Sequence, residues 1–184
     1  MIRPIVGYGH STLRQIAQPI DKSYPELETL INDMFETMYN AYGVGLAAPQ
    51  IDLSIRLVVI DTTPMAEAYP DEASLKICFI NPEIVEESGT PWLYNEGCLS
   101  LPELHEDVLR KPTIKLRYRD LDFNTHEEEF SGIRARVIQH ELDHLEGKVF
   151  IDRLSPLRKT LLKRKLKDLS LGKIRTDYRM KYQK

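Results

Sequence analysis

Two histidines stand four residues apart in the second half of the chain, with a glutamate directly after the first of them. Residues 139–144 read Gln-His-Glu-Leu-Asp-His. An α-helix turns by about 100° per residue, so His140 and His144 would share one face and could bind one metal ion. A bound metal ion lowers the pKa of water, and Glu141 is placed to handle the proton that this water loses. The segment therefore predicts a hydrolytic metal site on a helix.

A cysteine upstream of this segment offers a third ligand. Cys98 follows Gly97 in the run Glu-Gly-Cys-Leu-Ser, residues 96–100, and glycine suits a backbone that passes close to a ligand. Cys78 lies instead in the apolar run Ile-Cys-Phe-Ile, which is typical of a buried structural cysteine. One cysteine and two histidines leave a fourth metal position open for water, as a catalytic site requires.

Two other classes of protein stay open on these residues. A zinc endopeptidase of the metzincin pattern would have a histidine at position 150, where the chain has Phe150. A thermolysin-like enzyme takes a glutamate from well downstream, and only Glu146 follows His144. A non-enzymatic module, with a structural metal site and a basic tail that binds RNA, would need a fourth protein ligand, and the sequence offers no evident one.

The composition is that of one globular domain. The chain has 184 residues, of which 42% are hydrophobic and 29% charged, enough to bury a core without disulfides. The net charge of −3 gives no general signal for nucleic-acid binding, but residues 157–184 hold eleven Lys and Arg against two Asp. We therefore divide the chain into a single catalytic domain, residues 1–170, and a basic C-terminal tail, residues 171–184, which need not be ordered.

The same composition indicates a compartment. Two cysteines do not form a disulfide scaffold, and a thiolate that binds metal favours a reducing environment. The first residues lack the apolar core of a signal peptide, and no stretch approaches the length of about 18 apolar residues that a membrane span needs. We expect a cytoplasmic protein.

The apolar pattern predicts the elements that must position these residues. A helix is expected from Leu27 to near Gly43, and residues 43–50, rich in glycine and broken by proline, are expected to form a loop. The metal-binding helix should span residues 133–146, and a last helix should begin at residues 155–156. Strands are expected at residues 55–61, 76–81, 84–87, 113–119 and 126–130. This order predicts an α+β fold, with antiparallel or mixed sheets packed around a central metal-binding helix and with a C-terminal helix.

Three segments together resemble the motifs of the peptide deformylase family in order and in spacing. They are residues 43–50 (Gly-Val-Gly-Leu-Ala-Ala-Pro-Gln), residues 96–100 and residues 139–144. The resemblance extends from Ile2 to about Leu169. It implies an α+β fold around a helix that carries both histidines. It also implies a metal-dependent amide hydrolase that releases formate from the N-terminal formylmethionine of newly made proteins.

The resemblance implies a role for each motif residue. The ion would be held by three side chains, those of Cys98, His140 and His144. The family commonly uses Fe²⁺, and a thiolate with two imidazoles also accommodates Zn²⁺, Ni²⁺ or Co²⁺. Glu141 would transfer the proton, and the Gln50 side-chain amide and the backbone N–H of Leu99 would stabilise the oxyanion. Without the other motifs, Gln50 would be taken for a surface residue that closes a loop.

The substrate requires an apolar pocket for methionine and a surface for the peptide that follows. Candidates for the methionine pocket are Val44, Leu99, Ile133 and Val137, and core packing explains these four equally well. Downstream residues of the nascent peptide would bind as an added strand along residues 43–45, including Gly45, and along Gly97. The resemblance further implies a monomer and an organism or organelle that initiates translation with formylmethionine. The first residues do not resemble a transit peptide, so we expect the bacterial cytoplasm.

The basic C-terminal segment has two interpretations. It is either a solvated helix face followed by a frayed end, or a contact to ribosomal RNA that holds the enzyme near emerging peptides. Under either interpretation, residues 173–184 are expected to be dispensable for hydrolysis of a short formyl-Met peptide.

Overall fold

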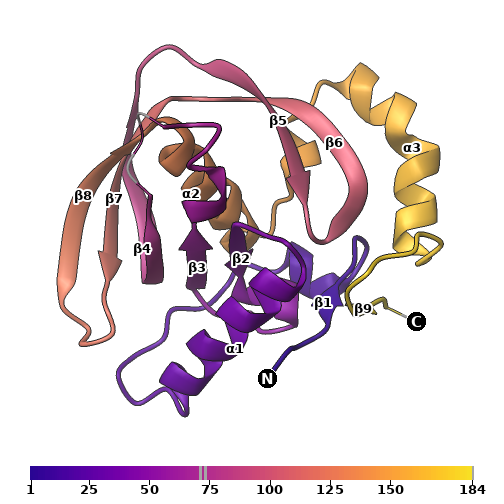
Figure 1. Cartoon of the computed structure of the whole chain (residues 1–184). Coiled ribbons are helices and arrows are strands. Elements are labelled where there is room, and N and C mark those ends of the chain that lie inside the picture. The colour runs from indigo at the N-terminus through magenta and orange to yellow at the C-terminus, as the bar shows by residue number, and fades with distance from the viewer. Residues whose placement is uncertain (71, 73, 184) are drawn as a thin grey trace.

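The computed structural model describes residues 1–70, 72 and 74–183. Three α-helices lie among the strands (Figure 1): α1 (Leu27–Asn40), α2 (Gly132–Leu145) and α3 (Pro156–Ser170). The strands are β1 (Ile5–Val6), β2 (Gly45–Ala47), β3 (Leu57–Asp61), β4 (Lys76–Ser88), β5 (Trp92–Cys98), β6 (Leu101–Arg110), β7 (Thr113–Arg119), β8 (Thr125–Ser131) and β9 (Met180–Lys181). Short 3₁₀ turns span Ser11–Arg14, Ala48–Ile51, Thr63–Met65 and Phe150–Arg153. The predicted α+β fold is confirmed.

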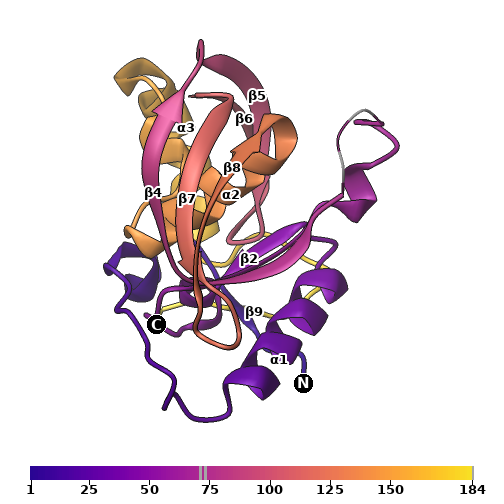
Figure 2. The same ribbon diagram turned by 90° about the vertical axis from the view of Figure 1, so that its left-hand side faces the viewer.

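The largest sheet is antiparallel and has the strand order β2-β3-β4-β7-β8. Figure 2 shows β4, β7 and β8 side by side across α2. Side chains of β3 alternate between the two faces of the sheet. Val58 and Ile60 pack in the hydrophobic cluster that includes residues of α2, whereas Leu57 and Val59 pack in the cluster that includes residues of α1. Both faces of β3 are therefore buried, as its continuous apolar run indicates.

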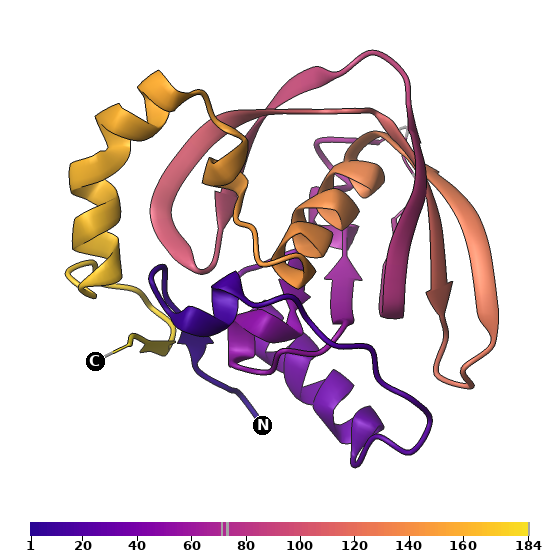
Figure 3. The same ribbon diagram turned by 180° about the vertical axis from the view of Figure 1, so that it is seen from behind.

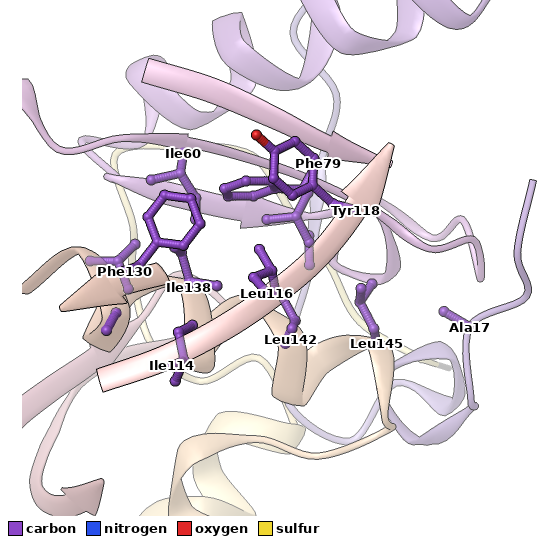
Figure 4. Close-up of a cluster of buried hydrophobic side chains, with 14 residues drawn as sticks. Ala17, Ile60, Phe79, Ile114, Leu116, Tyr118, Phe130, Ile138, Leu142 and Leu145 are labelled. Carbon is purple, nitrogen blue, oxygen red and sulfur yellow. The ribbon is translucent and has the colours of Figure 1, made fainter. Parts of the chain in front are cut away.

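Helix α2 is central because it is apolar on the side that faces the sheet. Its residues Ile138, Leu142 and Leu145 are at most 5% exposed. They point toward Leu116 and Phe79 of the sheet (Figure 4). Each large side chain buried in this way stabilises the fold by roughly 1.5–3 kcal/mol. The sheet thus fixes one side of the helix and leaves the opposite side for the predicted metal ligands.

Strand β4 is a single element where the sequence predicts two strands, 76–81 and 84–87. The pairing with β7 shifts register between Ile80 and Glu83 and again between Ile84 and Glu86. Asn81 has a φ of 49°, and its side chain bonds the backbone of Ile20 in both directions, at 2.9 and 2.7 Å. The Asn-Pro pair therefore forms a bulge within one strand, not a break between two.

The expected loop at residues 43–50 is wrong in part. Gly45–Ala47 form strand β2, which pairs with β3 through Gly45 opposite Ile60, and residues 48–51 form a 3₁₀ turn. Glycine and proline suggested a loop, but tertiary pairing overrides that local preference. In the part of the chain that the structure describes, β2 is an edge strand of the five-stranded sheet.

The β5–β6 hairpin was not predicted. Inward positions of β6 alternate with exposed ones, but they include the charged residues Glu106 and Arg110 beside Leu104 and Val108. These charges interrupt the apolar alternation from which a strand is recognised. Figure 3 shows the hairpin and α3 on one side of α2. The hairpin packs on residues 149–151 and on α3 through Leu162 and Leu169.

The two ends of the chain meet beside this hairpin. Strand β9 pairs in parallel with β1, with Ile5 opposite Met180 and Val6 opposite Lys181. The segment set apart above as a basic tail therefore has defined contacts with the body through residue 182. No helix within the described residues has the length and apolar character needed to cross a membrane.

Candidate active site

The three predicted metal ligands come together where the end of strand β5 meets helix α2. One ligand atom from each of Cys98, His140 and His144 lies within 4.8 Å of the others. Cys98 Sγ is 3.3 Å from His144 Nε2. Both histidines are buried on α2, one turn apart, with His144 in the last turn of the helix, and the hairpin brings the thiol to them. A soft thiolate beside two imidazoles fits a divalent transition metal.

Glu96 orients the first histidine. Its Oε2 lies 2.9 Å from His140 Nδ1, which leaves His140 Nε2 as the nitrogen available to a metal ion. A carboxylate behind a histidine ligand fixes the tautomer and the ring orientation. Burial alone would raise the pKa of Glu96, but hydrogen bonds from Arg110 and His140 hold this pKa well below its usual range. Glu96 is therefore ionised.

Glu96 also anchors a buried charged layer between the hairpin and α2. Arg110 donates to both Glu96 oxygens at 2.7 and 2.9 Å and to Asp143 at 2.7 Å. Arg136 donates to Glu96 Oε1 at 3.0 Å and stacks 4.5 Å from the Trp92 ring centroid. In the sequence, Glu96 stands out only as part of a motif, and the two arginines were not predicted to belong to the site. A signal for this buried layer was present in the sequence, because both arginines stand in segments that otherwise bury their side chains.

Glu141 lies buried beside the ligands and is 4% exposed. Its Oε2 has no hydrogen-bond partner among the described residues. Burial raises the pKa of Glu141 to about 7, so this carboxyl can exchange a proton near neutrality. The lack of a side chain at Gly45 of β2 makes room for the Glu141 carboxyl group, because a Cβ atom at Gly45 would lie 2.4 Å from Glu141 Oε1.

Gln50 points its amide nitrogen at the turn that carries Cys98. The nitrogen Nε2 lies 3.6 Å from Cys98 Sγ and 3.3 Å from Ser100 Oγ. Its Oε1 accepts from the Ala47 N–H at 2.9 Å, which fixes the orientation of the amide. Gln50 is 1% exposed, so the interpretation of it as a surface residue does not hold.

A cavity of about 560 Å³ opens over these residues. Its lining includes Gln50, Cys98, His140 and Glu141 together with the predicted substrate contacts Val44, Gly45, Gly97, Leu99 and Val137. His144 is fully buried behind it. Ile133 is not brought there: it lies 2% exposed beside Met65 and Tyr69, one turn beyond Val137. Lining residues that the sequence did not single out include Tyr42, Tyr94, Arg175 and Tyr178.

Comparison with known proteins agrees with this geometry. A model of the family described as polypeptide deformylase matches residues 2–160. The chain belongs to the peptide deformylase family. A peptide deformylase of Christiangramia forsetii is 52% identical over 99% of this chain and 96% of its own length. One of Cytophaga hutchinsonii is 50% identical over 99% of this chain and 98% of its own.

Solved structures give the same result. The crystal structure of a peptide deformylase from Legionella pneumophila is 40% identical, with a TM-score of 0.80 over 96% of this chain and 99% of the other. The expected family, fold and reaction are thereby confirmed. The protein is a metal-dependent hydrolase that removes the formyl group from N-terminal formylmethionine.

We predict that Cys98→Ser will weaken metal binding by more than the roughly 10–100-fold typical of losing a supporting group. A serine hydroxyl is a poor substitute for a thiolate on a transition metal. Cys78→Ser is the matched control, because Cys78 lies in β4 and is not among the clustered ligands. Bound metal is quantified per folded protein. Equal metal content in the two variants would contradict the assignment of Cys98.

We predict that Glu96→Gln will lower metal affinity roughly 10–100-fold, because His140 loses its orienting carboxylate. It should also lower the free energy of unfolding by about 3–5 kcal/mol, since the buried Arg136 loses its carboxylate partner and the buried Arg110 keeps only Asp143. Titration with metal and urea unfolding measure the two effects.

Glu106→Gln is the control for this prediction. Glu106 is paired with Glu96 across the hairpin but bonds the half-exposed Arg158, at 2.6 and 2.8 Å. The control should keep its metal affinity. Unchanged affinity in Glu96→Gln as well would show that Glu96 does not orient His140.

Proposed function

We propose that Cys98, His140 and His144 hold the divalent cation of this deformylase, and that Glu141 moves the proton in the reaction. The observation that carries the proposal is the cluster of three ligand atoms beside one cavity, which Cys98, His140 and Glu141 line and behind which His144 is buried. Glu141 Oε2 has no hydrogen-bond partner among the described residues. The same cavity reaches an open strand edge, which a peptide substrate needs.

The chain's own residues account for the proton transfers. A divalent cation held by one thiolate and two imidazoles acts as a Lewis acid and lowers the pKa of water. Glu141 accepts the proton of the water that attacks the formyl carbon, and then returns it to the amine nitrogen that leaves. Burial raises the pKa of Glu141 above its ordinary value, which suits a group that accepts a proton and then returns it.

Gln50 and Leu99 stabilise the oxygen that becomes negative during the attack. The Gln50 amide nitrogen is held beside Cys98, and Leu99 is the next residue in the same turn. The Gln50 amide and the Leu99 N–H are therefore neighbours on the cavity wall. The loss of one donor of this kind typically raises the barrier by about 2.7–4 kcal/mol.

The substrate lies between two strand edges. Strand β2 is an edge of the main sheet, and Gly45 of β2 and Gly97 of β5 both line the cavity. A peptide that adds to these edges through its main chain can vary its side chains, as a general processing enzyme requires. Val44, Leu99 and Val137 form the apolar wall for methionine, and Ile133 is left out because it lies outside the cavity.

We propose Fe²⁺ as the native ion. The thiolate and two imidazoles accommodate Fe²⁺ and equally Zn²⁺, Ni²⁺ or Co²⁺, and iron is the common choice of the family. The bacterial relatives and the two free cysteines support the bacterial cytoplasm as the compartment, and we expect a monomer there.

The function is tested by anaerobic purification, metal analysis and an assay of formate release from a formyl-Met peptide. We expect stoichiometric iron and formate release, and we expect air to abolish activity that Ni²⁺ or Co²⁺ restores. Glu141→Gln should keep its metal and lose roughly 10²–10⁴-fold in kcat. Glu146→Gln is the control, because Glu146 caps the same helix but is exposed and bonds Arg56. Loss of metal together with activity in Glu141→Gln would make Glu141 a ligand or a structural group.

We further propose that the basic face of α3 contacts ribosomal RNA. Lys163, Arg164 and Lys167 are exposed on this helix, whereas Lys165 already donates to the Glu103 carbonyl. An RNA-coated surface would attract these charges, and each neutralised phosphate adds to the salt dependence of binding.

We predict that the double variant Lys163→Gln/Lys167→Gln will sediment less with ribosomes at low salt while its hydrolysis of a short peptide is unchanged. The log–log salt slope should fall by roughly one for each phosphate that the variant no longer neutralises. Lys22→Gln/Lys148→Gln removes the same charge from exposed positions elsewhere. Identical sedimentation of both variants at every salt concentration would exclude α3 as the binding surface.

A further inference from the structure

We propose that the C-terminal segment is part of the active site, and that Tyr178 is a positioning residue for the turn that carries Cys98 and Leu99. The Tyr178 hydroxyl donates to the Leu99 carbonyl at 2.8 Å, across 79 residues of sequence. Arg175, Thr176 and Asp177 line the same cavity as Tyr178. The proposal rests on the role proposed above for the Leu99 N–H.

The turn at residues 98–100 needs external support. The β5–β6 pairing shifts register between Gly97 and Cys98, so the turn leaves the regular ladder where the ligand stands. Three contacts from outside the hairpin hold it. Tyr178 bonds the Leu99 carbonyl, the Tyr8 N–H bonds the Ser100 carbonyl at 2.8 Å, and Gln50 reaches Ser100 Oγ at 3.3 Å.

The first two of these contacts come from the paired chain ends. Tyr8 follows β1, and Tyr178 precedes β9. The two strands are joined by hydrogen bonds from Ile5 N–H to the Arg179 carbonyl and from Gly7 N–H to the Lys181 carbonyl, both 2.8 Å. Lys181 also pairs with Asp52. The residues that flank the two paired strands thus bond two successive carbonyls of the turn: Tyr178 bonds that of Leu99, and Tyr8 bonds that of Ser100.

These contacts affect the reaction because they fix the position of the Leu99 backbone. The Leu99 N–H belongs to the Cys98–Leu99 peptide and the Leu99 carbonyl to the Leu99–Ser100 peptide, and the two planes share the Leu99 Cα. A rotation of the whole turn about its ends would move both groups and turn the N–H away from the cavity. A donor that stabilises the transition state is effective only when it is already aimed, and small displacements of such groups cost large factors in rate. Tyr178 holds the carbonyl side of Leu99, so it limits this rotation without touching the reacting atoms.

The expectation that residues 173–184 are dispensable for hydrolysis therefore changes. Removal of Tyr178 takes away one side chain that lines the cavity and the hydroxyl that donates to the Leu99 carbonyl. A chain that ends at Asp177 should lose at least as much kcat as the single variant described next.

The test is Tyr178→Phe, which keeps the ring and removes only the donor. We expect kcat for formate release to fall roughly 10-fold, because one buried carbonyl loses its partner. KM and metal content should stay the same within about twofold, since the Leu99 N–H bonds the negative oxygen only in the transition state. Tyr182→Phe is the control: its hydroxyl is buried, has no partner among the described residues and is not part of the cavity wall.

Two results would overturn the inference: an unchanged kcat in Tyr178→Phe, whether or not KM rises, or loss of metal. Gln50→Ala, assayed in parallel, separates this failure from failure of the oxyanion proposal. If Gln50→Ala lowers kcat and Tyr178→Phe does not, only the positioning role is wrong. If neither variant changes kcat, the proposed oxyanion site is wrong as well.

Discussion

The ionised carboxylate of Glu96 is the group on which the site depends. It lies 4% exposed between the hairpin and α2, where an unpaired charge would cost several kcal/mol. Arg110 of the hairpin and Arg136 and His140 of the helix together satisfy it. Because both sides of the interface contribute, the hairpin is held against α2 in one register. In that register Cys98, two residues beyond Glu96, stands next to His144.

A second constraint is the close approach of β2 to α2. Gly45 leaves just enough space for the Glu141 carboxylate, so the edge strand and the carboxyl group proposed to transfer the proton both line the cavity. Open strand edges are usually blocked because they invite aggregation. Here the edge strand begins at the cavity, which Gly45 lines, and that is where the proposed peptide substrate would pair with it.

The C-terminal segment extends this architecture past the region that the family model matches. That match ends at residue 160, whereas relatives such as that of Christiangramia forsetii align over 99% of the chain. The parallel pairing of β9 with β1 uses backbone hydrogen bonds, which need no particular side chains. The side chain of Tyr178 then turns the chain end into a support for the site.

The proposed ligand chemistry and the elements with clean periodicity follow from the amino-acid sequence alone. His140 and His144 share a face because the helix repeat is local, and β7 appears at the predicted residues 113–119 for the same reason. Which distant residues meet these groups depends on tertiary packing. The hairpin was not predicted because Glu106 and Arg110 face inward, paired with Arg158 and Asp143, which lie far away in sequence. Ile133 and Val137 are one turn apart on the same helix, yet only Val137 reaches the cavity. The extent of the cavity along α2 is set by where the hairpin and the C-terminal segment pack, which no local pattern encodes.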